Sequence, residues 1–169
     1  INNLKDGMIW GLLPILLLSI NLNTEQIGLI AAAYPTFWGI GQLFTGRLSD
    51  FYSKKRMLFW GMLIQGISIL FLPFINYFFL LLCLSILLGI GTAIVYPSFL
   101  NVLAEESPPL QRAESIGVFR LWRDLGYAIG AIISGITADL FGLEFSIILI
   151  GLITIMSSII IQFRMPSKS

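Results

Sequence analysis

The stretch Gly46-Arg47-Leu48-Ser49-Asp50-Phe51-Tyr52-Ser53-Lys54-Lys55-Arg56 is a short charged turn between two long apolar segments. It holds five charged residues, in a sequence that is only 11% charged and is 57% hydrophobic. A soluble domain of 169 residues has too little interior to bury so much apolar surface. In a membrane protein, charges are confined to loops and to working sites. The composition and this turn therefore predict a chain that crosses a membrane several times.

Six apolar segments reach or approach the length needed to cross a bilayer. A helix rises about 1.5 Å per residue, so about 20 apolar residues span the hydrocarbon core. The segments lack the strict alternation of barrel strands, which favours helices. The first segment is short, and we expect its helix to continue back through Ile1–Asp6 into residues upstream of this sequence. The predicted fold is all-α, one six-helix transmembrane bundle over residues 1–169, with spans at about 7–20, 27–48, 57–75, 77–102, 116–140 and 145–163.

The basic residues predict the orientation of the bundle. If Asn21–Gln26 lies outside, all ten Lys and Arg residues fall at or near the opposite side, and the outer connections carry only acids. This asymmetry fits the positive-inside rule for an even number of spans. We therefore expect an integral membrane protein, in the plasma (inner) membrane, with both termini cytoplasmic. Pro108-Pro109 lies between the fourth and fifth spans and leaves a clean start for the fifth. Two groups of three helices would suit nested three-helix repeats.

The charged turn resembles the signature loop of the major facilitator superfamily, Gly-x-Leu-(Ala/Ser)-Asp-(Arg/Lys)-x-Gly-(Arg/Lys)-(Arg/Lys). Phe51 replaces a base of that pattern and Ser53 its glycine. The resemblance implies a conformational switch in which Asp50 accepts hydrogen bonds at a helix end and pairs with nearby bases. The alternative is a solvated inner loop whose basic residues only fix topology. The residues that fit the pattern are Gly46, Leu48, Ser49, Asp50, Lys54 and Lys55.

Glycines in the fifth segment provide a second resemblance to the same family. Gly117, Gly126 and Gly130 have the spacing Gly-x(8)-Gly-x(3)-Gly, and Gly135 follows, whereas Ala131 replaces the family's proline. Gly126 and Gly130 lie one above the other on a helix and permit close approach of another backbone. We expect this helix to pack against a partner half. Ordinary packing between small residues is the alternative.

Arg120, Arg123 and Asp124 precede the last two of those glycines. They follow the proline pair by about three turns, so they lie at least partly within the membrane. Arg120 and Asp124 are four residues apart and can pair along one face. Charges at this depth are costly unless they face protein or water. We interpret the three residues as a charge lock between two halves, with direct contact to an anionic substrate as the alternative.

Asp6 is the only acid in the first segment and shares one side of a helix with Trp10 and with Asn2 or Asn3. If the helix extends upstream, Asp6 lies inside the bilayer and can take up a proton or pair with a cationic substrate. If the helix starts near Lys5, Asp6 is only an interfacial acid. Lys5 points about 100° away around the helix, so we expect that it need not neutralise Asp6.

Further residues at helical spacing are candidates for lining a solute cavity. In the family that the two motifs resemble, the first and fourth helices of each half line the cavity, and the second and fifth help to close it. Aromatic and small residues at such spacing also serve ordinary packing. The candidates are Tyr34, Trp38 and Gln42 in the second segment and Ser85, Thr92 and Tyr96 in the fourth.

The resemblance runs over nearly all of the sequence and implies one six-helix half of a secondary transporter, with the C-terminal half favoured. The implied function is proton-coupled transport of a small-molecule substrate by alternating access, with the lipid bilayer and the other six-helix half as partners. The alternatives are a half-length protein that acts as a homodimer, and a membrane fragment or assembly module without transport activity. The sequence has no His, so we expect no His-dependent catalysis and no His-ligated metal. We also expect no cofactor, and no nucleic-acid partner because the basic residues mark topology.

Overall fold

The computed structural model describes residues 2–108 and 111–165, without the side chains of Arg47, Ser49, Asp50, Phe51, Glu105 and Glu106. The regular structure of these residues is entirely helical, which confirms the all-α prediction. Each of the six long helices overlaps one predicted span. The elements are α1 (Asn2–Ser19), α2 (Thr24–Phe51), α3 (Lys54–Phe71), the short 3-10 helix η1 (Leu72–Phe74), α4 (Phe78–Glu106), α5 (Arg112–Phe141) and α6 (Leu143–Arg164).

Local sequence signals explain several helix ends. At the start of α2, the Asn23 side chain accepts a hydrogen bond from the Gln26 backbone at 2.9 Å, and the Gln26 side chain accepts one from the Asn23 backbone at 3.2 Å. This reciprocal capping box satisfies backbone donors that the helix itself cannot. At the end of α5, Gly142 has φ 96°, a left-handed conformation that glycine adopts without strain.

Five segments of the described chain are long and apolar enough to cross a membrane. The first predicted span, at about 7–20, lies in α1, which is not among these five segments. The 18 residues of α1 begin with a polar turn. Protein encloses this turn, since Lys5 and Asp6 are 0% and 1% exposed. The neighbouring helices therefore shield the polar part of α1 from lipid. The five candidate spans are Thr24–Gly46, Lys54–Phe74, Phe78–Ala104, Arg112–Phe141 and Leu143–Arg164.

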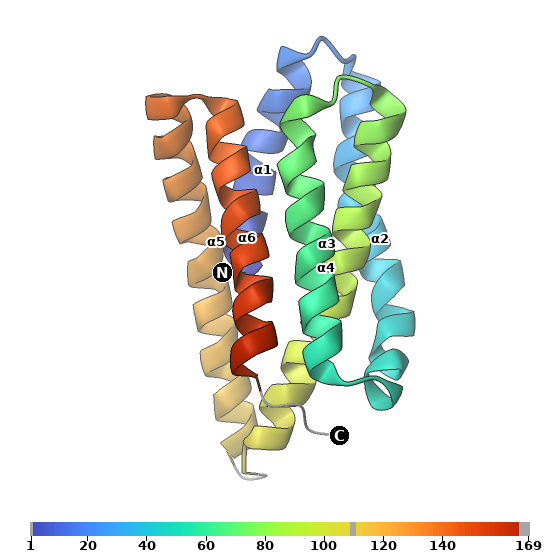
Figure 1. The fold of residues 1–169 in the computed structure, drawn as a ribbon, viewed down its shortest axis with the longest axis vertical. Helices are drawn as coiled ribbons and strands as arrows, with labels where there is room; N and C mark the ends of the chain where they lie inside the picture. The colour runs from blue at the N-terminus through green and yellow to red at the C-terminus, as the bar shows by residue number, and fades with distance from the viewer. Residues whose placement is uncertain (1, 109–110, 166–169) are drawn as a thin grey trace.

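Four helix pairs make the most extensive contacts: α1 with α5, α2 with α4, α3 with α6 and α3 with α4. Figure 1 shows α5 and α6 on one side of the bundle and α2 and α4 on the other. Exchanging α1 with α4, α2 with α5 and α3 with α6 converts the α1–α5 contact into the α4–α2 contact and preserves the α3–α6 contact. Two structurally related three-helix units would give these equivalences, although the α3–α4 contact is more extensive than its equivalent between α6 and α1.

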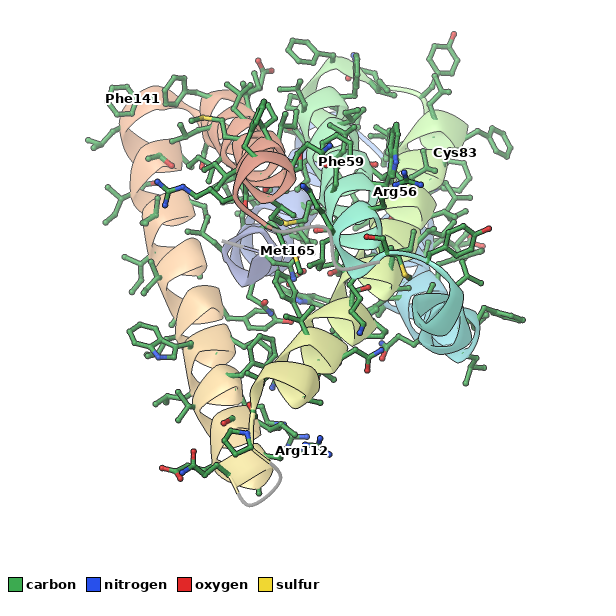
Figure 2. The ribbon with its side chains drawn as sticks, turned by 60° about the horizontal axis from the view of Figure 1, so that its bottom comes forward. Arg56, Phe59, Cys83, Arg112, Phe141 and Met165 are labelled. Carbon is green, nitrogen blue, oxygen red and sulfur yellow. The ribbon has the colours of Figure 1, made fainter. Side chains whose placement is uncertain are left out.

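Large apolar side chains cover the outside of the bundle. Leu43, Phe79 and Phe163 are 73%, 75% and 83% exposed, and Figure 2 shows Phe141 projecting from the edge of the bundle. Soluble monomers rarely expose contiguous apolar surfaces of this kind. Together with the five candidate spans, this surface makes the chain an integral membrane protein.

Candidate functional site

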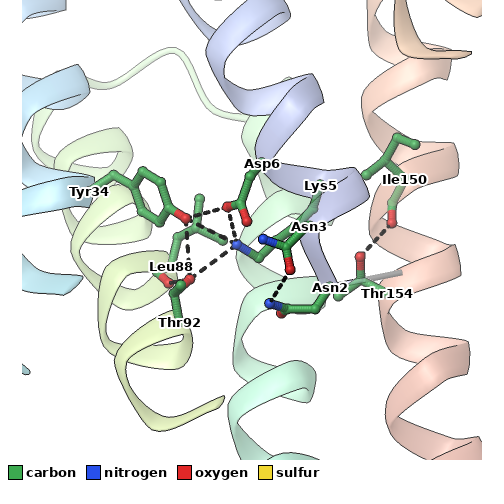
Figure 3. Close-up of polar contacts among 9 residues, drawn as sticks. All are labelled: Asn2, Asn3, Lys5, Asp6, Tyr34, Leu88, Thr92, Ile150 and Thr154. Carbon is green, nitrogen blue, oxygen red and sulfur yellow. Dashed lines mark hydrogen bonds and ion pairs between the residues drawn. The ribbon is translucent and has the colours of Figure 1, made fainter. Parts of the chain in front are cut away.

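Four polar side chains from three helices meet inside the bundle (Figure 3). Lys5 and Asp6 come from α1, Tyr34 from α2 and Thr92 from α4, and we call them the Lys5–Asp6 cluster. The Lys5 Nζ donates to Asp6 Oδ1 at 2.5 Å and to the hydroxyls of Tyr34 and Thr92 at 3.1 Å each. The Tyr34 hydroxyl donates to the same Asp6 oxygen. The cluster therefore joins α1, α2 and α4 through one amine and one carboxylate.

The Lys5–Asp6 cluster lies level with the middle of the surrounding helices. Thr92 is the central residue of α4, Phe78–Glu106. Beside the cluster, Asn3 packs against Gly126, which is near the middle of α5. Both α4 and α5 are candidate membrane spans. Asp6 therefore lies level with the middle of α4 and α5.

Burial makes this ion pair energetically demanding. Moving an ion out of water costs several kcal/mol, and a close partner with additional hydrogen bonds offsets that cost. Lys5 and Asp6 meet this condition through each other and through the two hydroxyls. The expectation that Lys5 points away from Asp6 is wrong. The long lysine side chain bends back, so the angle between the two residues around the helix does not separate their charged ends.

Four aromatic rings form a continuous row across α1, α2 and α4, and we call Trp10, Tyr34, Trp38 and Tyr96 the aromatic row. Successive ring centroids lie 6.1, 6.0 and 6.2 Å apart, and the rings of Tyr34 and Trp38 are nearly parallel, at 23°. Trp10 is 52% exposed, whereas Tyr34 is buried. The indole Nε1 of Trp38 is buried and has no hydrogen-bond partner among the described residues.

Arg123 of α5 lies at the Tyr96 end of this row. Its Nη1 donates to the Tyr96 hydroxyl at 3.0 Å, and its guanidinium carbon lies 6.0 Å from the centre of the Tyr96 ring. Its Nε lies 2.9 Å from a carboxylate oxygen of Asp124. Asp124 therefore pairs with the adjacent Arg123 and not with Arg120 as expected, and the Tyr96 hydroxyl also accepts a hydrogen bond from Arg123. Arg120 is exposed.

The glycines of α5 occupy two different environments. A methyl group on Gly130 would lie 2.1 Å from the Leu4 carbonyl oxygen, and one on Gly126 would lie 3.3 Å from Cβ of Asn3. Both glycines therefore pack against α1 of the same chain, and the expectation that they face a partner half is wrong for these two. The reason is that α1 crosses α5 closely at this point. A methyl group on Gly117 or Gly135 would have no atom within 4 Å.

The remaining cavity candidates lie outside the Lys5–Asp6 cluster and the aromatic row. Ser85 of α4 is buried and donates to the Ile30 carbonyl at 2.6 Å, so it ties α4 to α2. Gln42 of α2 is part-buried. Of the six positions predicted to line a cavity, Tyr34 and Thr92 meet in the Lys5–Asp6 cluster, and Trp38 and Tyr96 join Tyr34 in the aromatic row. Ser85 makes a packing contact instead.

The charged turn connects α2 to α3 at one end of the bundle. α2 ends at Phe51 and α3 begins at Lys54. Gly46, Lys54 and Lys55 are part-buried, and Leu48 is 44% exposed. The side chain of Asp50 lies outside the described residues, so its predicted switch contact remains a prediction.

Two features of the site were not found from the sequence. One is the role of Lys5 as the counter-ion of Asp6, and the other is the unpartnered Trp38 indole. The role of Lys5 could have been predicted, because a base directly before an acid in an apolar segment is unusual for a membrane helix. The second depends on the packing of three helices, and no pattern within one segment indicates it.

A bundle of membrane-spanning helices with partly related three-helix groups around a buried charged cluster fits a membrane transport protein. The family model described as Major Facilitator Superfamily matches residues 1–169. The chain belongs to this family.

Several relatives of this chain are longer proteins that it matches over part of their length. An uncharacterized MFS-type transporter of Methanocaldococcus jannaschii is 29% identical over 159 residues, which cover 94% of this chain and 41% of the relative. The 4-hydroxybenzoate transporter PcaK of Pseudomonas aeruginosa is 27% identical, covering 88% of this chain and 37% of the relative. The quinolone resistance protein NorA of Staphylococcus aureus is 26% identical, covering 79% and 34%. The chain thus spans about two fifths of the length of these relatives or less.

Proposed function

We propose that this chain forms part of a secondary transporter that moves a small solute across a membrane by alternating access and couples it to protons through Asp6. The observation that carries the proposal is the buried Lys5–Asp6 cluster. Charges at mid-depth of a membrane bundle are costly and mark ion or proton pathways. One relative is named for 4-hydroxybenzoate transport and another for quinolone resistance, so the names support a small organic solute without selecting one.

Protonation of Asp6 would remove the charge that balances Lys5. The other acceptors of the lysine, the hydroxyls of Tyr34 and Thr92, are neutral, and Tyr127 of α5 is a further titratable group close to the cluster. An unpaired buried lysine costs several kcal/mol, which is comparable to the gap between two conformations of one protein. Proton binding therefore loosens the contacts between α1, α2 and α4 and shifts the conformational equilibrium.

The same proposal assigns this chain a second six-helix half as its partner, with this chain as the C-terminal half, in the plasma membrane and with cytoplasmic termini. The partial coverage of the relatives supports a second half. Arg120, which α5 exposes, Gly117 and Gly135 are then candidates for contact with that half, as is Asp50 in the charged turn. A homodimer of half-length chains and a non-transporting assembly module are the alternatives.

The experiment measures proton movement in proteoliposomes that contain the complete transporter and an enclosed pH dye. We expect a transported solute, found by screening small organic acids, amines and neutral compounds, to carry protons across the membrane. Asp6→Asn should abolish this proton movement and uphill accumulation, while exchange of labelled solute continues. The double variant Lys5→Met/Asp6→Asn, which leaves no unpaired charge, should lose coupling in the same way.

Glu25→Gln is the matched control, because Glu25 is an exposed acid in the first turn of α2. This variant should transport solute and protons like the wild type. Unchanged proton coupling in Asp6→Asn would refute the role of Asp6, and an absence of solute movement in the wild type would refute transport itself.

A further inference from the structure

We infer that the aromatic row and Arg123 form a solute-recognition surface whose ligand is a planar aromatic carboxylate. The inference rests on the proposed transport function and adds the chemical class of the solute.

The aromatic row provides the apolar part of this surface. Aromatic rings favour offset-stacked or edge-to-face partners with centroids 4.5–7 Å apart, and the row already has this spacing along its length. Trp10 leaves about half of its surface open, and Trp38 and Tyr96 are only part-buried. A flat ring can therefore continue the row, whereas a saturated ring of the same size lacks the π face and edge.

Trp38 provides an unused hydrogen-bond donor. An indole N–H can only donate, and that of Trp38 is buried without an acceptor among the described residues. Its neighbour Tyr34 instead has its hydroxyl fully engaged with Lys5 and Asp6. A buried donor without a partner costs free energy, and an acceptor on a ligand beside the indole would recover it.

Arg123 provides the charge. Its planar guanidinium has five N–H donors, which suit a carboxylate in a two-pronged contact. The contacts within the described chain use Nη1 toward Tyr96 and Nε toward Asp124. Donors on the guanidinium therefore remain, and the Arg123 side chain is 24% exposed.

The charges of the described residues favour an anion over a cation. Asp6, the acid closest to the row, is 1% exposed and already paired with Lys5. Asp124 is paired with Arg123, and Arg120 adds a second exposed positive charge on α5. An aromatic amine would therefore meet only acids that are already paired, whereas an aromatic carboxylate would meet the remaining N–H donors of Arg123 and the exposed charge of Arg120.

The experiment compares four probes of similar size against the complete transporter in detergent, with calorimetric titration as the readout. Benzoate has both the ring and the negative charge, cyclohexanecarboxylate has only the charge, benzamide has only the ring, and benzylamine has a ring and a positive charge. We expect benzoate to bind about tenfold more tightly than each of the other three.

Two variants assign the contacts. Trp38→Phe retains a ring but removes the N–H, and should weaken benzoate binding about 3- to 10-fold. Trp60→Phe is its matched control, because Trp60 lies on α3 beside Phe59 and away from the aromatic row, and should bind benzoate normally. Arg123→Gln should weaken benzoate about 10- to 100-fold but benzamide by less than about threefold.

The outcomes separate this inference from the transport proposal. Tighter binding of benzylamine or cyclohexanecarboxylate than of benzoate, or equal benzoate binding by Trp38→Phe and wild type, overturns the inference. If such a probe also moves protons in the proteoliposomes, transport stands and only the solute class falls. If benzoate binds as expected but moves no protons, the recognition surface stands and the coupling proposal falls. If none of the four probes binds, the inference is rejected whatever the transport assay shows.

Discussion

Lys5 and Asp6 are adjacent in the sequence, and their charged ends meet inside the bundle with Nζ 2.5 Å from Oδ1. Both side chains are buried, so water stabilises neither charge. Hydroxyls from α2 and α4 hydrogen-bond to the pair, so side chains from three helices stabilise the two charges. Any change that removes only one of the two charges should affect both stability and the relative positions of these helices.

The first prediction concerns this pair. Asp6→Asn should lower the free energy of unfolding by about 3–5 kcal/mol, because it leaves the Lys5 amine buried and unpaired. Lys5→Met/Asp6→Asn removes both charges and should regain at least half of that loss. Thermal unfolding in detergent measures both values. Glu25→Gln, at an exposed acid, should unfold like the wild type. Equal melting temperatures for Asp6→Asn and Glu25→Gln would show that the pair contributes nothing.

The second prediction concerns the crossing of α1 and α5. A methyl group on Gly130 would lie 2.1 Å from the Leu4 carbonyl oxygen, which is backbone and cannot turn aside. Gly130→Ala should therefore force the helices apart and destabilise the protein by about 1–3 kcal/mol or more. Gly39→Ala, in α2, meets no atom within 4 Å beyond its own helix and should be neutral or stabilising by up to about 1 kcal/mol, because Ala favours helix. A normal melting temperature for Gly130→Ala would contradict the close crossing.

Much of the fold could be predicted from the sequence because apolar length and charge position act locally. The long apolar runs predicted helices whose bounds are close to those observed for α2 to α6. The first helix was expected to continue back through Ile1–Asp6, and α1 does begin at Asn2. The sequence could not show that α2, α4 and α5 pack around this polar turn and bury Lys5 and Asp6.

The candidate site could be predicted only in part, because it depends on contacts between helices. Asp6, Tyr34 and Thr92 were chosen separately, and the structure joins them through a residue that was set aside, Lys5. The spacing of Gly126 and Gly130 predicted a close helix contact, and the structure has one, but with α1 of the same chain. A helical repeat shows that a face packs; it does not identify what it packs against.

The third prediction concerns Gln65 of α3. This side chain is fully buried, and neither its amide nitrogen nor its amide oxygen has a hydrogen-bond partner among the described residues. Gln65→Met keeps the length of the side chain and removes both polar atoms, so the melting temperature should stay equal or rise. Gln162→Met, at an exposed position of α6, should leave it unchanged. A lower melting temperature for Gln65→Met would show that the amide is satisfied in the folded protein, for example by an enclosed water molecule.

The last prediction concerns orientation. Figure 1 shows the α1–α2 and η1–α4 connections at one end of the bundle and the α2–α3 connection at the other. The positive-inside rule, applied to the basic residues of the charged turn, predicts that the α2–α3 end is cytoplasmic. We therefore expect cysteines at Glu25 and Asn76 to react with an impermeant thiol reagent added outside intact cells, and a cysteine at Ser53 to remain unlabelled. Glu25 is used because the neighbouring Asn23 side chain caps α2. The background carries Cys83→Ser, since Cys83 is exposed. Labelling of the Ser53 cysteine after permeabilisation is the control for reactivity. Its labelling in intact cells, with protection of the other two, would invert the topology and remove the basis for cytoplasmic termini.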